Sequence, residues 1–142
     1  MRALLDVNVL IALLDPDHAH HGRVREWFRV EAPRGWASCP ITQNGCVRIM
    51  SQPAYPNRLA PAAIVDRLGH ATRHPLHERW ADDVSLLDPE LVDASRIHGP
   101  KPITDVYLIA LAAAHGGRFA TMDARVTSAA VRAASADTVV VV

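Results

Sequence analysis

Three aspartates, Asp6, Asp105 and Asp123, stand where short apolar runs of the sequence meet expected helix starts. In an open α/β sheet, strand ends and helix starts converge on one crevice, so we expect the three carboxylates to lie together. At an effective dielectric of about 20, two such charges about 4 Å apart repel each other by roughly 4 kcal/mol. A divalent cation removes that repulsion, so the sequence predicts a metal site.

Carboxylate oxygens with retained waters suit Mg²⁺ or Mn²⁺ better than Zn²⁺. A metal of this kind activates water and stabilises charge on a phosphate during in-line attack, without a nucleophilic side chain. Simpler roles exist for two of the acids, since Asp105 could be a helix-start acid and Asp123 a helix N-cap. Their joint placement with Asp6 and Asn8 favours the metal site.

Apolar segments that alternate with amphipathic ones are expected to position these acids. Strands are expected at residues 2–6, 35–39, 84–87, 118–121 and 138–142. Helices are expected at residues 8–14, 19–31, 42–50, 61–74, 90–97, 105–115 and 124–134. Thr104 is expected to cap the helix at 105–115 through its hydroxyl. The alternation predicts a three-layer α/β/α fold with a mainly parallel central sheet.

Length and composition indicate one domain over residues 1–142, long enough to bury a core without disulfides. The two cysteines, Cys39 and Cys46, are too few for a disulfide scaffold, and a reduced, cytoplasmic compartment is expected. No apolar run approaches the length of a membrane span. Fifteen basic and fifteen acidic residues balance, which argues against nucleic-acid binding by bulk charge alone.

The segments around the aspartates resemble the PIN domain, and most closely the VapC-type ribonuclease toxins of bacterial toxin–antitoxin pairs. The motifs are Leu-Leu-Asp6-Val-Asn8-Val-Leu, Thr104-Asp105-Val-Tyr-Leu-Ile-Ala-Leu-Ala and Ala120-Thr121-Met-Asp123. Two further patterns resemble one branch of that family: His18-x-x-His21 before Trp27-Phe28, and Thr42-Gln43-Asn44-Gly45 followed by Arg48.

The resemblance implies a Mg²⁺- or Mn²⁺-dependent endoribonuclease whose products carry 5′-phosphate and 3′-hydroxyl ends. It makes the three aspartates the metal ligands and implies that Asn8 and Thr121 orient them or bind a metal-bound water. Gln43 stands where many family members carry a Glu, and neutral Gln ligates Mg²⁺ weakly, so a second tightly held metal is in question. Arg25 and Arg48 are candidates for phosphate contacts, with surface salt bridges as the equal alternative.

For its biology, the resemblance implies cleavage of tRNA or ribosomal RNA, inhibition of translation, a cognate antitoxin and a homodimer. Two alternatives stay open on the sequence. A PIN nuclease of RNA maturation or DNA would cause no growth arrest dependent on Asp6. A degraded, non-catalytic binding module, consistent with Gln43, would leave RNA ends unchanged in Mg²⁺ or Mn²⁺.

Overall fold

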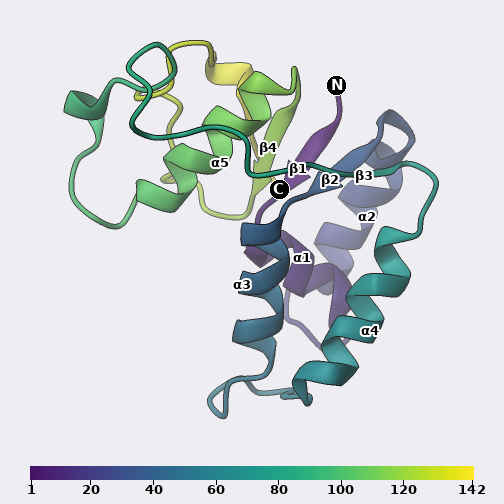
Figure 1. Cartoon of the computed structure of the whole chain (residues 1–142). Coiled ribbons are helices and arrows are strands. Elements are labelled where there is room, and N and C mark those ends of the chain that lie inside the picture. Colours follow the sequence, from purple (N-terminus) through teal and green to yellow (C-terminus); the bar gives the residue numbers. More distant parts are fainter.

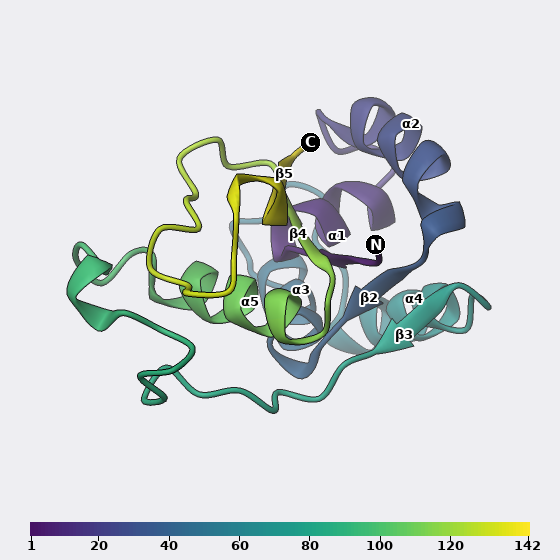
Figure 2. The ribbon, with the colours of Figure 1, turned by 90° about the horizontal axis from the view of Figure 1, so that it is seen from above.

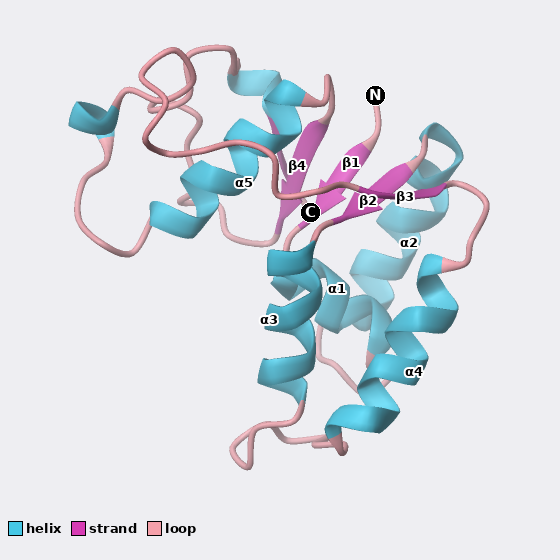
Figure 3. Ribbon diagram, in the orientation of Figure 1, coloured by secondary structure: helices cyan, strands magenta, loops and turns pink.

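The computed structural model describes residues 1–142 and contains one sheet of five parallel strands in the order β3-β2-β1-β4-β5. The strands are β1 (Ala3–Leu5), β2 (Trp36–Ser38), β3 (His77–Arg79), β4 (Arg118–Thr121) and β5 (Val139–Val141). β1 lies at the centre between β2 and β4 (Figure 3). The carboxyl ends of these three neighbouring strands therefore share one edge of the sheet.

Five α-helices cover the sheet, and four of them lie on one face (Figure 1). These four are α1 (Val7–Leu14), α2 (His21–Glu31), α3 (Pro40–Met50) and α4 (Pro61–Thr72). The fifth, α5 (Ile103–Ala114), packs on the opposite face, as the view from above also shows (Figure 2). None of these helices combines the length and apolar character needed to cross a bilayer.

Alternate residues of β1 divide the core into two layers. Leu4 is fully buried in the cluster beneath α5, whereas Ala3 and Leu5 are buried in the cluster beneath α1–α4. Successive side chains of a strand point to opposite faces, so a run such as Ala-Leu-Leu requires cover on both sides. The expected three-layer α/β/α fold with a parallel central sheet is confirmed.

The segment between β3 and α5 differs from the sequence prediction. The strand expected at 84–87 is absent, and the helix expected at 90–97 is reduced to a 3₁₀ turn at Ala94–Arg96. The observed edge strand is instead the polar His77–Arg79, which pairs in parallel with Trp36–Ser38. An edge strand has one solvated side, so it needs no apolar run and the sequence pattern missed it.

The helix expected at 124–134 is also wrong, since these residues form turns. Val131 instead makes an antiparallel bridge to Val92, and backbone bonds join Ala130 to Asp93 and Arg132 to Leu91. Ala130 and Val131 are buried in the α5 cluster. These long-range contacts outweigh the helix propensity of the alanine-rich sequence. Asp123 therefore does not cap a helix.

Thr104 does not cap α5 as expected. The helix begins at Ile103, two residues before the expected start at residue 105, and Thr104 lies inside its first turn. The N-cap position is held by Pro102, which provides no side-chain hydrogen bond to the helix. Asp105 is consequently the acidic residue of the first turn, where the helix dipole favours a negative charge.

Gly45 allows α3 to pack closely on the start of α1. A Cβ atom at this position would lie 2.8 Å from a methyl group of Val7, a stiff β-branched residue next to Asp6. We expect Gly45→Ala to lower the free energy of unfolding by about 1–2 kcal/mol, because overpacking exceeds the gain in helix propensity. Denaturant unfolding measures this, and Gly69→Ala, at an open helical position, should not destabilise.

Candidate active site

Asp6 follows β1 directly and is the N-cap residue of α1. Its side chain is 8% exposed, and its Oδ1 accepts a 2.7 Å hydrogen bond from the Val7 N–H. Its Oδ2 accepts a 2.6 Å bond from the hydroxyl of Thr121, at the end of the neighbouring β4. Burial raises the pKa of Asp6, while these two hydrogen bonds lower it and the charge of Asp123 raises it further. The carboxylate is thus held firmly at the shared sheet edge.

Thr121 and Asn8 tie the first and last motifs together. The Thr121 hydroxyl oxygen accepts hydrogen bonds from Asn8 Nδ2 at 3.2 Å and from the Asp123 N–H at 3.1 Å. Asn8 Oδ1 accepts a 3.1 Å bond from the Met122 N–H. Both side chains therefore lie between Asp6 and the chain leading to Asp123, and their role in orienting metal ligands stays a prediction.

Asp105 is half-buried in the first turn of α5 and has no hydrogen-bond partner on its carboxylate. Burial raises its pKa to about 6, with further contributions from the negative charges of Asp6 and Asp123. Electrostatic repulsion from both other acids shows that the three carboxylates lie within each other's field. A nearby cation would favour the charged form of Asp105.

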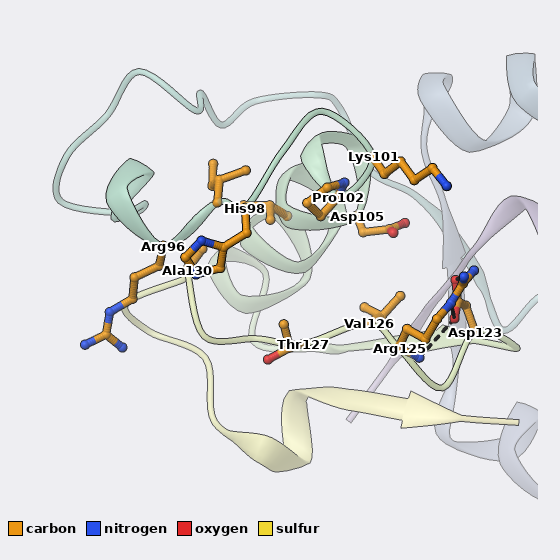
Figure 4. A pocket seen from close by; sticks show the side chains of 12 residues that line it. Arg96, His98, Lys101, Pro102, Asp105, Asp123, Arg125, Val126, Thr127 and Ala130 are labelled. Carbon is orange, nitrogen blue, oxygen red and sulfur yellow. Dashed lines mark hydrogen bonds and ion pairs between the residues drawn. The ribbon is translucent and has the colours of Figure 1, made fainter.

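Asp123 is held by its own neighbour, Arg125. The guanidinium donates from Nε to Oδ1 and from Nη2 to Oδ2, both at 2.9 Å, and the Arg125 N–H also donates to Oδ1 (Figure 4). These hydrogen bonds lower the pKa of Asp123 to about 2. Because Arg125 is 86% exposed and Asp123 32%, the ion pair is accessible to solvent.

In this arrangement, no three His, Cys, Asp or Glu side chains are grouped closely enough to hold one ion between them. Two of the carboxylates have partners within the fold: Asp6 accepts from the Thr121 hydroxyl, and Asp123 is paired with Arg125. The chemistry of the donors nevertheless fits a hard divalent cation, since all are carboxylate oxygens in a net negative environment.

An open cavity of about 590 Å³ adjoins Asp105 and Asp123. Its walls are the loop before α5, the first turn of α5 and the segment after Asp123. Four residues with basic side chains line it: Arg96, His98, Lys101 and Arg125. A chain with zero formal net charge thus gathers basic groups beside its acidic cluster.

Gln43 lies in the first turn of α3, behind the end of β2. Its Nε2 donates a 2.9 Å hydrogen bond to Ser38 Oγ, which also lies 2.8 Å from His77 Nε2. Ser38 ends the strand next to β1, so Gln43 is near the same sheet edge as Asp6. Its role in the site stays a prediction.

Arg25 and Arg48 lie apart from this cavity. Arg25 is exposed on α2, beside a second, mainly apolar cavity of about 500 Å³ bounded by α1, α2 and α4. Arg48 is exposed in the last turn of α3. Neither lines the space next to Asp105 and Asp123, and their contact with phosphate remains a prediction.

The basic residues that line the cavity were not among the site residues predicted from the sequence. Arg125 follows Asp123 by two residues. This spacing, which is visible in the sequence, allows a turn with a side-chain ion pair. Arg96 and Lys101 were not predictable as site residues, because their position depends on the irregular path from β3 to α5.

Comparison with known proteins agrees with this fold. The family model of the PIN domain matches residues 3–132. Ribonuclease VapC44 of Mycobacterium tuberculosis is 54% identical over 135 residues, which cover 95% of each chain. From the same organism, Ribonuclease VapC39 is 42% identical, covering 92% of this chain and 94% of its own. Ribonuclease VapC38 is 43% identical, with 87% and 86% covered.

The chain therefore belongs to the PIN-domain family. Within that family it is of the VapC type, since relatives of this type match nearly the whole chain at up to 54% identity. The resemblance drawn from the aspartate motifs is confirmed.

Proposed function

We propose that residues 1–142 form a single-domain, Mg²⁺- or Mn²⁺-dependent endoribonuclease, the toxin of a type II toxin–antitoxin pair. It hydrolyses phosphodiester bonds in tRNA or ribosomal RNA and thereby inhibits translation. One observation carries the proposal: in a chain 54% identical to a protein named as a ribonuclease, Asp6 follows the central strand, and Asp105 and Asp123 line a cavity with basic walls.

The three aspartates would hold the metal through carboxylate oxygens. When bound, Mg²⁺ or Mn²⁺ supplies an activated water and neutralises charge on the scissile phosphate. Thr121 and Asn8 fix the orientation of Asp6, so that this carboxylate needs little reorganisation. Arg125 must leave Asp123 before that carboxylate can act as a ligand, which frees a guanidinium close to incoming phosphate.

We also propose that a cognate antitoxin neutralises the enzyme and that the protein acts as a homodimer in the cytoplasm. The pairing of Arg125 with Asp123 indicates how an antitoxin would inhibit cleavage. An Arg from an antitoxin segment could pair with the carboxylates in the same bidentate manner.

Purified protein incubated with total RNA in Mg²⁺ or Mn²⁺ tests the function. We expect discrete fragments with 5′-phosphate and 3′-hydroxyl ends, and growth arrest when the protein is expressed in cells. RNA with unchanged ends would support the binding module instead. Cleavage in vitro without Asp6-dependent growth arrest would support an RNA-maturation nuclease.

Thr121→Val tests how the site is oriented. Valine keeps the buried shape but removes the hydroxyl that contacts Asp6, Asn8 and the Asp123 N–H. We expect about 10- to 100-fold slower RNA cleavage, as is typical for the loss of an orienting partner. We expect Thr121→Ser, which keeps the hydroxyl, to retain most activity. Equal loss in both variants would point to packing, and not the hydroxyl, as the cause.

A further inference from the structure

The cavity beside the carboxylates has two distinct ends. Figure 4 shows Lys101 and Arg125 at the same end as Asp105 and Asp123, whereas the side chain of Arg96 extends at the other end. If a phosphate of the RNA substrate is held at the carboxylates, the adjacent nucleotide of the same RNA strand would therefore lie inside the cavity.

The basic residues of the cavity differ in their availability. Arg125 is engaged with Asp123, and Arg96 has Asp93 at 3.6 Å and donates to the Ala129 carbonyl at 3.4 Å. Lys101, the one lysine of the chain, is exposed and has no ion pair or hydrogen bond from its ammonium group. An ammonium without a partner is a point charge ready for phosphate.

Most of the remaining wall is apolar. Ile97 and Val126 are partly buried hydrophobic residues that pack on the α5 core, and Ala130 is 3% exposed. A volume of about 590 Å³ is in the range of pockets that enclose a small ligand. A free cation next to an apolar wall matches the two parts of a nucleotide, its phosphate and its flat base.

We propose that this cavity is a subsite for one nucleotide of single-stranded RNA adjacent to the cleaved bond, with Lys101 contacting its phosphate and Ile97, Val126 and Ala130 receiving its sugar and base. The inference rests on the proposed ribonuclease function and names the form of its substrate. An unpaired strand is required because a base must leave its stack to enter such a cavity.

RNA binding by Lys101→Gln tests the subsite. The probe is a random-sequence, single-stranded RNA of about 12 nucleotides, with all proteins in the Asp6→Asn background so that the RNA stays intact. We expect the Kd at low salt to rise about tenfold or more, as for the loss of one charge-assisted contact. The slope of log Kd against log salt should fall by about 0.7, the value for one phosphate of a single strand.

Two variants control for charge. Lys101→Arg keeps the positive charge and should retain most of the affinity. Arg23→Gln removes one charge from an exposed position on α2, away from the cavity, and should leave the salt slope unchanged.

Reductive methylation with formaldehyde and cyanoborohydride gives a readout independent of mutation. The chain has two amines, Lys101 and the α-amine of Met1, which serves as the internal reference. We expect bound RNA to protect Lys101 and not Met1, as read by mass spectrometry.

Unchanged affinity and salt slope in Lys101→Gln, or equal methylation of Lys101 with and without bound RNA, would overturn the subsite. If the unmutated protein still cleaves RNA, the proposed function stands, the RNA strand follows another path and the cavity is open to a protein partner. If it neither binds nor cleaves RNA, the function fails and the subsite with it.

Discussion

Asp6→Asn is expected to abolish RNA cleavage while the protein stays folded. The substitution removes a carboxylate from the metal site, and the several kcal/mol that a metal contributes to the transition state correspond to roughly a 10³-fold or greater loss of rate. The fold tolerates the change because the neutral side chain removes a buried charge whose pKa is already raised by burial. Initial rates on total RNA and thermal unfolding measure the two effects.

A matched control separates the site from general charge. Asp66 is exposed on α4 and makes no ion pair or hydrogen bond through its side chain, so Asp66→Asn should cleave RNA at the unmutated rate. Full activity in a folded Asp6→Asn protein would refute the assignment of Asp6. An unfolded Asp6→Asn protein would move the test to Asp105→Asn, at a carboxylate that forms no hydrogen bond within the fold.

Removal of divalent ions is expected to abolish cleavage and to lower the melting temperature. A ligand that binds the folded state at 100 times its Kd adds about 2.7 kcal/mol to the free energy of unfolding. For a chain of this size that corresponds to roughly 5–10 °C. Thermal unfolding with Mg²⁺ or Mn²⁺, compared with EDTA at equal ionic strength, measures the shift, and Asp105→Asn should remove most of it.

The melting-temperature shift should depend on pH. With a folded pKa of about 6, Asp105 is ionised at pH 7.5 and largely protonated at pH 5. Protons therefore compete with the cation as pH falls through about 6, and the Mg²⁺-induced shift should shrink. In EDTA, the contribution of Asp105 to stability changes with pH in the opposite direction. Because the folded pKa exceeds the ordinary value of 3.8, this group stabilises the metal-free fold at low pH, and that contribution is lost as pH rises through about 6. A shift independent of pH would contradict a role for Asp105.

The buried elements and the three acids were predictable because their signals are local. Apolar runs such as Ala3–Leu5 and Phe119–Thr121 indicate buried strands with cover on both faces, and an acid shortly after each is expected near the common sheet edge. The first turn of α5 placed Asp105 in the same way, although its start was misplaced by the expected Thr104 cap.

The parts that were not predictable depend on long-range contacts. The edge strand His77–Arg79 is polar. Residues 124–134 form no helix and make backbone hydrogen bonds to residues 91–93. The walls of the cavity, including Lys101, follow from these irregular segments. The local sequence pattern therefore predicts the three acids, whereas the positions of the basic residues around them depend on tertiary structure.

A crystal of the protein soaked in Mn²⁺ and measured at the manganese absorption edge tests the central claim most directly. The account predicts an anomalous peak bounded by the carboxylates of Asp6, Asp105 and Asp123, with the Arg125 guanidinium displaced from Asp123. A peak at another site, or Arg125 still paired with Asp123 at saturating Mn²⁺, would contradict it.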